Sequence, residues 1–146
     1  MAADRLVPYG AFNFAVEIDG IAVAGFSDVS GLNTEITISE YREGTYPLNH
    51  VLKVPGIHKV GDVTLKRGII DSKEFWDWIK QVRQEGVRAQ RNVSVILMDE
   101  SHNEVQRWNL RGVIPLKWTG PTLAAKGGGD VAMEELVLSA EALELD

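Results

Sequence analysis

The feature that most constrains the fold is an alternation of apolar and polar residues that returns several times along the chain. It is clearest over residues 12–18, FNFAVEI, which are apolar at every second position. Such alternation is typical of a strand with one buried face. Asp19-Gly20 separates this run from a second apolar run at residues 21–26. Asp-Gly favours a type I′ turn, because both central residues need positive φ, so the two runs are predicted to form a β-hairpin.

Similar patterns predict further strands at residues 34–41, 60–67, 93–98, 105–110 and 113–118. The strands at 93–98 and 105–110 flank a polar turn and form a second predicted hairpin. Pro115 indicates an edge or a bulge in the strand that follows. Residues 27–32 are predicted as a turn, because they contain Asp28, Ser30 and Gly31.

One helix is predicted near the middle of the chain. Asp71 and Glu74 fit a capping box, and Gly86 supplies a stop signal. Between them, the apolar residues fall at helical spacing: Phe75, Trp78, Ile79 and Val82.

The C-terminal stretch, residues 131–145, suits either a helix or a strand. Its Glu, Leu and Ala content favours a helix. As a strand, it places one set of residues on one side: Ala132, Glu134, Leu136, Leu138 and Ala140. The preceding segment, with Gly127-Gly128-Gly129, is predicted to be flexible. Strands in succession with one short helix indicate a mainly β fold, a small antiparallel β-barrel or two packed sheets with one flanking α-helix, in a single domain over residues 1–146.

The sixteen residues from Glu43 to His58 show neither helical nor strand periodicity. Loops of this length are either functional or disordered. Disorder is disfavoured, because the segment is rich in apolar residues and carries only two charges, Glu43 and Lys53. Such a loop must bury its apolar groups, either over an open end of its own fold or on another subunit. We favour the second interpretation.

Composition excludes several classes of protein. A formal net charge of −6 argues against general nucleic-acid binding, which needs a cationic face. The chain has no cysteine, so disulfides, thiolate nucleophiles and zinc-thiolate sites are excluded. No run approaches the ~20 apolar residues that span a bilayer, and the N-terminus does not resemble a signal peptide. Synthesis in the cytoplasm without a membrane anchor is therefore expected.

No pattern for catalysis, a cofactor or a metal is found. Phosphate-binding loops and nucleophile elbows are missing, and His50, His58 and His102 lack metal-ligand spacing. The protein is therefore predicted not to be an enzyme and to need no cofactor. Trp78, on the apolar helix face, is predicted to be core, whereas Trp76 lies off that face and covers a sheet edge or enters an interface. The alternative function is a monomeric β-barrel that binds a small apolar ligand, with the tryptophans as a platform and the long loop as a lid.

Short blocks follow one another in a recognisable order: FAVEIDG at 14–20, GFSDVSGL at 25–32, YREG at 41–44, KVPG at 53–56, VTLKRGI at 63–69, FWDW at 75–78, PLK at 115–117 and GP at 120–121. In this order they resemble the tail tube, or inner tube, protein family of contractile phage tails and contractile injection systems. The resemblance implies a fold like that of the haemolysin-coregulated tube protein of type VI secretion. It also implies a long final strand at the C-terminus.

The resemblance implies a structural function. Such proteins form hexameric rings that stack into a hollow tube, which is driven through a target envelope and conducts DNA or protein cargo. The implied partners are further copies of the chain, the contractile sheath protein, baseplate or hub proteins and a tube terminator. The particle would be a phage tail or an injection particle inside or outside the cell.

In this family the long loop reaches toward the neighbouring ring, which implies a contact region here. The predicted inter-ring or inter-subunit residues are Arg42, Glu43, Gly44, Tyr46, Leu48, Val51, Leu52, Lys53, Val54, Pro55, Gly56, Ile57 and Trp76. Arg42 and Glu43 either add charged contacts between subunits or pair within the chain. A closed ring needs head-to-tail contacts, and open sheet edges are expected to pair between subunits.

Overall fold

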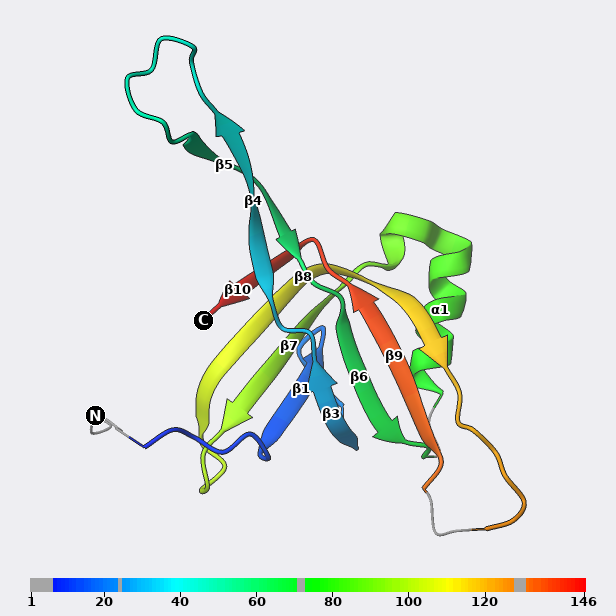
Figure 1. Cartoon of the computed structure of the whole chain (residues 1–146). Helices are drawn as coiled ribbons and strands as arrows, with labels where there is room; N and C mark the ends of the chain where they lie inside the picture. Colours follow the sequence, from blue (N-terminus) through cyan, green and yellow to red (C-terminus); the bar gives the residue numbers. More distant parts are fainter. Residues whose placement is uncertain (1–6, 24, 71–72, 128–130) are drawn as a thin grey trace.

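The computed structural model describes residues 7–23, 25–70, 73–127 and 131–146. Over these residues the chain forms ten strands, one α-helix and one short 3-10 helix (Figure 1). Their bounds are β1 Phe14–Ile18, β2 Ile21–Val23, β3 Phe26–Ser30, β4 Thr34–Tyr41, β5 Leu52–Val60, β6 Val63–Gly68, α1 Glu74–Glu85, η1 Gly86–Ala89, β7 Arg91–Met98, β8 Glu104–Thr119, β9 Met133–Ser139 and β10 Ala142–Leu145.

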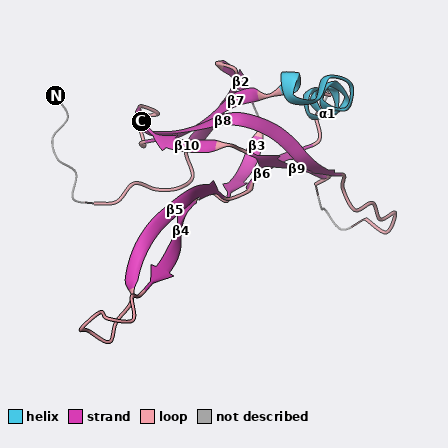
Figure 2. Ribbon diagram, turned by 90° about the horizontal axis from the view of Figure 1, so that it is seen from above, coloured by secondary structure: helices cyan, strands magenta, loops and turns pink. Residues whose placement is uncertain are grey.

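The body is one antiparallel sheet that bends into two packed layers, and the predicted mainly β fold with a flanking helix is confirmed. The strand order is β2-β1-β7-β8-β9-β6-β3, with β10 paired to β8. Strands β4 and β5 form a separate two-stranded sheet. It extends away from the body, and α1 lies on the opposite side of the body (Figures 1 and 2).

Strand β8 joins the two layers. Its first part pairs with β7 and β10, and its second part, from Ile114 to Thr119, pairs with β9. Between the two parts lies Gly112, whose φ of 62° lets the backbone turn from one layer into the other. The sequence predicted two strands, 105–110 and 113–118, where the structure has one bent strand. The bulge predicted at Pro115 is confirmed by the register shift between Pro115 and Lys117.

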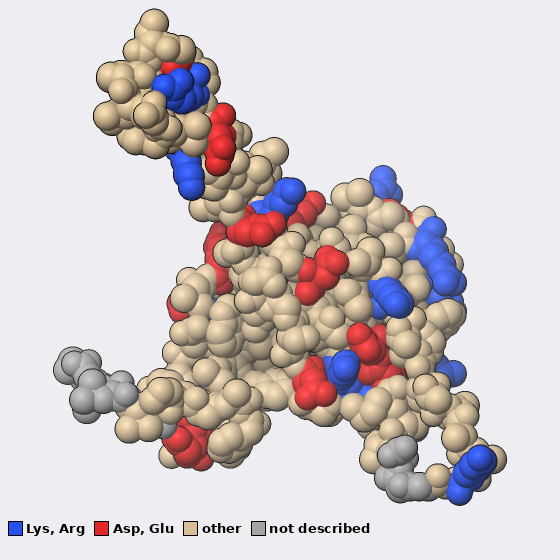
Figure 3. All heavy atoms as spheres, in the orientation of Figure 1, with Lys and Arg blue, Asp and Glu red and all other residues tan. Residues whose placement is uncertain are grey.

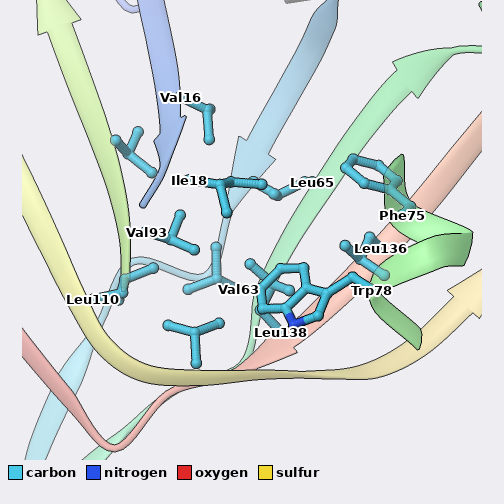
Figure 4. Packing of buried hydrophobic residues seen from close by; sticks show 12 residues of the cluster. Val16, Ile18, Val63, Leu65, Phe75, Trp78, Val93, Leu110, Leu136 and Leu138 are labelled. Atoms are coloured by element: carbon cyan, nitrogen blue, oxygen red, sulfur yellow. The ribbon is translucent and has the colours of Figure 1, made fainter. Parts of the chain in front are cut away.

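The hydrophobic core fills the space between the layers and the helix. Alternating residues of β1, β6, β7, β8 and β9 supply most of it, and Phe75 and Trp78 of α1 complete it (Figure 4). Trp78 is buried, as predicted, and its indole N–H donates to the carbonyl of Ala89 at 2.9 Å. Each fully buried large apolar side chain contributes roughly 1.5–3 kcal/mol. The core therefore belongs to the body, and among the described residues of the β4–β5 hairpin only Val60, at the root, packs against it.

Two local predictions are confirmed by the backbone. Asp19 and Gly20 have φ values of 53° and 79°, as a type I′ turn between β1 and β2 requires. The helix ends at Gly86, whose φ is 61°. The predicted cap residue Asp71 and the glycine segment at 128–129 lie outside the described residues. The first strand begins at Phe14, so Phe12 lies outside it and is exposed.

Three predicted boundaries are wrong. Residues 27–32 were predicted as a turn, but most of them belong to β3, which pairs with β6. The polar residues of β3 are tolerated because the strand ends the path of the sheet and faces solvent on one side. The strand predicted at 60–67 begins at Val63, because β5 ends at Val60.

The predicted loop from Glu43 to His58 is also shorter than expected, because β5 occupies Leu52–Val60. All of β4 and nearly all of β5 are exposed on both faces. β4 still alternates and was predicted as a strand, whereas β5 has no regular apolar alternation, so its sequence resembles that of a loop.

The C-terminal stretch is β structure, as the family resemblance implied. It is divided into β9, which pairs with β6 and β8, and β10, which pairs only with the first part of β8 among the described residues. In β9 the side chains of Glu134, Leu136 and Leu138 are buried, as the strand interpretation predicted. The helix favoured by local propensity is overridden by this pairing and burial.

Candidate assembly interface

The candidate interface is the β4–β5 hairpin, and its root is held tightly to the body. Asn33 donates its backbone N–H to Gly31 and accepts one from Gly61. Gly31 has a φ of 88°, and a Cβ atom there would clash with the carbonyl oxygen of Asp62. Only glycine fits this position without strain. The two chain segments that enter and leave the hairpin are therefore closely packed against each other at its root.

The two strands of the hairpin run in a defined register. Thr34 pairs with Val60 at the root and Tyr41 with Leu52 near the tip. A bulge interrupts the ladder between Ile36 and Ile38. The bulge accommodates Pro55, which has no N–H to donate. Pro55 lies in β5, in a segment that was predicted to be a loop.

The hairpin carries many exposed apolar side chains. Ile57 is 73% exposed, and six others are between 43% and 54% exposed: Ile36, Ile38, Tyr41, Leu48, Leu52 and Val54. Most of its visible surface is uncharged (Figure 3). Clusters of this kind on a soluble protein mark interaction sites.

The tip of the hairpin is folded around Arg42. Its guanidinium donates to the carbonyl of Leu48 at 3.2 Å and to the carbonyl of Tyr46 at 3.4 Å. The ring of Tyr46 packs edge-on against His50, and Glu43 accepts from the Tyr41 hydroxyl at 3.4 Å. Arg42 therefore organises the tip through backbone carbonyls, which is a role that the sequence did not indicate.

The structure brings together all but one of the predicted contact residues. Residues 42–57 of that set lie on the single hairpin, whereas Trp76 lies on α1 at the other side of the body (Figure 2). Trp76 is 39% exposed and packs against Trp118 at 5.6 Å, with Arg83 over its ring. Trp76 thus belongs to a different surface. Ile36 and Ile38 were missed, because an apolar alternation in β4 was interpreted as a buried face.

Two ionic clusters lie away from the hairpin. Inside the body, Arg67 binds Glu134 at 2.7 Å, and the indole of Trp118 donates to the same carboxylate at 3.2 Å. On the outer face, Arg107 bridges Glu104 and Glu17. Hydrogen bonding to Arg107 lowers the pKa of Glu104, and the same bond raises the pKa of Arg107. Both clusters hold strands together within the chain.

Within the described ranges, no group of three His, Asp or Glu residues is placed to hold a metal ion. The described part of the chain also has no helix that is long and apolar enough to cross a membrane.

The sequence itself decides the family. Residues 10–144 match the model of the T4-like virus tail tube protein gp19 family. The chain belongs to this tail tube family. No curated protein sequence matches it.

Solved structures agree with this tail tube fold. The chain is similar to one in the sheath–tube complex of an extracellular contractile injection system, PVC, in its extended state, with 24% identity, coverage of 97% of this chain and 93% of that chain, and a TM-score of 0.85. It is similar to one in the tube-terminating cap of the anti-feeding prophage, with 23% identity, coverage of 100% and 95%, and a TM-score of 0.86. Hcp1 of Flavobacterium johnsoniae is more distant, with 12% identity, coverage of 90% and 93%, and a TM-score of 0.55.

The tail tube architecture contradicts the lid that the ligand-binding alternative requires. A groove of about 510 Å³ does lie between β3 and the β1–β7–β8 layer, and Trp108 lines it. The hairpin extends away from the body and does not cover this groove (Figures 1 and 2). The small-ligand alternative is not favoured.

Proposed function

We propose that this tail tube protein forms hexameric rings that stack into a hollow tube, with the β4–β5 hairpin as the contact between rings. The observation that carries the proposal is the hairpin itself, which has many apolar side chains that are exposed in the single subunit. The proposed contact residues are the predicted ones within residues 42–57, joined by Ile36 and Ile38. Trp76 is proposed as a separate contact between subunits.

The length of the hairpin supports a contact beyond the subunit. Eight residues of β4 at ~3.3 Å each reach about 26 Å from the root. A two-stranded hairpin alone in water is only marginally stable, so a surface that covers it stabilises it. The hairpin of one subunit would bind a different surface on a subunit of the next ring. Such a head-to-tail contact can repeat from ring to ring.

The proposed partners are a contractile sheath, baseplate or hub proteins and a tube terminator. Similar chains occur in structures described as a sheath–tube complex, a sheath/tube terminator and a baseplate. We infer assembly after cytoplasmic synthesis into a phage tail or contractile injection particle, with DNA or protein cargo in the lumen. The net charge of −6 suits a conduit through which acidic cargo passes without binding.

Membership of a structural family supports a mechanical rather than an enzymatic role, without a cofactor or a membrane anchor. We also propose that residues 1–146 form a single tail-tube domain. The match of the family model over residues 10–144 supports this.

The test is a shortened hairpin. An Asn-Gly turn replaces residues 37–57 and joins Ile36 to His58, which face each other in the register. The body should keep its thermal unfolding temperature, because none of the replaced residues packs against the core and Val60, which does, is retained. The unaltered protein should form rings and tubes in negative-stain images, whereas the shortened protein should form rings or soluble subunits only.

Thr37→Ser, a conservative change at an exposed hairpin position, is the control and should still form tubes. Tubes from the shortened protein would show that the hairpin is not the stacking contact. A shortened protein that unfolds would show that the hairpin is part of the core. If light scattering shows that the unaltered protein stays monomeric at high concentration, the proposal that it forms a tube is contradicted.

A further inference from the structure

The two faces of the β4–β5 hairpin carry apolar patches at different heights. Directly paired residues of an antiparallel ladder lie on the same face, and successive residues alternate between faces. The register therefore groups Ile36, Ile38 and Pro55 on one face. We call these residues the proximal patch, because they lie in the half of the hairpin nearer the root.

The other face carries a second group nearer the tip. Tyr41 pairs with Leu52, and Ser39 pairs with Val54, so Tyr41, Leu52 and Val54 share this face. We call these three residues the distal patch. Ile36 and Tyr41 are five residues apart, or about 16 Å along the strand. The two patches therefore face in different directions, and their centres lie at different heights, although Pro55 and Val54 are neighbours in β5.

Each face of the hairpin also carries one pair of oppositely charged residues. Glu40 faces Lys53 on the face of the proximal patch, toward the tip. Glu35 faces Lys59 on the face of the distal patch, toward the root. Because each acid lies opposite a lysine, both faces are close to neutral, and their binding rests on apolar contact.

The residues of both patches are all exposed, and the hairpin extends away from the body in two views (Figures 1 and 2). A single docking surface would bury one face and leave the apolar patch on the other face in water. We propose that the two faces bind two different copies of this chain. The proximal patch contacts one copy and the distal patch another, so each hairpin links three subunits.

The proposed occupant is the chain itself, and this inference rests on the proposed stacking of rings. A tail tube supplies many identical copies, and a head-to-tail contact offers each hairpin the same surfaces at every repeat. Near-neutral faces suit self-association. All copies of the chain carry the same negative net charge, so negatively charged faces would repel one another.

The experiment counts the copies that one hairpin touches. The photoreactive residue p-benzoylphenylalanine replaces Ile36, Tyr41 or both, in a tagged chain. A small minority of tagged chains is assembled with an excess of unaltered chains, and the sedimented tubes are irradiated. Each tagged chain then crosslinks only to unaltered neighbours. Denaturing gels probed for the tag report the number of chains joined.

We expect dimers from each singly substituted chain and trimers from the doubly substituted chain. Dimers alone from the doubly substituted chain would overturn the inference, because both faces would then bind one copy. If neither position gives a crosslinked product in intact tubes, the inference is overturned as well, and the hairpin is not part of the interface. If the unaltered protein forms no tubes at all, the proposed function fails first, and this inference falls with it.

Discussion

Arg67 and Glu134 form an ion pair inside an otherwise apolar core, at directly opposed positions of β6 and β9. Their exposed fractions are 1% and 8%. The guanidinium also lies 4.0 Å over the ring of Phe75. The pair therefore joins the sheet to the helix, and each buried charge compensates the other.

Removing one charge of this pair should destabilise the subunit. Glu134→Gln removes the buried counter-ion of Arg67 and leaves it only the exposed carboxylate of Glu74 at 3.8 Å, and loss of a buried partner costs about 3–5 kcal/mol in such settings. A loss of that size lowers the unfolding temperature by roughly 10 °C or more in a chain of this length. Glu135→Gln, on the opposite face of the same strand, is the matched control and should change little. Calorimetry of soluble subunits measures both, and equal effects would show that the buried pair has no special role.

At the scale of elements, the sequence predicts the strands of the body better than it predicts the β4–β5 hairpin. The β1–β2 hairpin, the face of α1 and the β7–β8 hairpin were predictable, because each has a buried side or a turn with defined φ values. Leu52–Val60 was not predictable, since neither of its faces is buried in the subunit. The length and apolar content of residues 43–58 indicated a contact with another subunit, and the family resemblance implied the individual contact residues at 42–57. The pairing of Arg67 with Glu134 depends on a register that a single sequence does not specify.

The root of the hairpin supports a prediction of its own. Gly31→Ala places a Cβ against the carbonyl of Asp62 and imposes positive φ on alanine, which by itself costs about 1–3 kcal/mol. We expect a lower unfolding temperature and a misdirected hairpin, and therefore fewer tubes. Gly44→Ala, where a Cβ would meet nothing within 4 Å, is the control for the folding measurement. A Gly31→Ala protein as stable as the Gly44→Ala protein would contradict the tight fit of the root.

At the scale of the whole molecule, the chain divides into a body with a complete core and an arm without one. Val16, Leu65, Leu110 and Leu136 are fully buried in the body, whereas every residue of β4 is exposed. The body is therefore expected to fold first and to persist as a soluble subunit. The arm is expected to acquire most of its stability on assembly.

Hydrogen exchange should separate the two parts. In soluble subunits, backbone amides of β6 and β9 should exchange slowly, and those of β4 and β5 rapidly, because local opening is easiest where burial is least. In assembled tubes, the amides of β4 and β5 should become slow while those of β6 and β9 change little. Unchanged exchange of the hairpin on assembly would contradict its role as an interface.

The glycine junction at residue 31 has a mechanical consequence for any stack of such subunits. The root has no room for a Cβ atom at Gly31, and we expect this close packing to make every hairpin leave its subunit at nearly the same angle. Small angular errors would otherwise add up from ring to ring and bend a long column. A tube that is driven forward stays straight only if the contacts between its rings are rigid. The close packing of Gly31 against Asp62 would stiffen the hairpin root in every subunit.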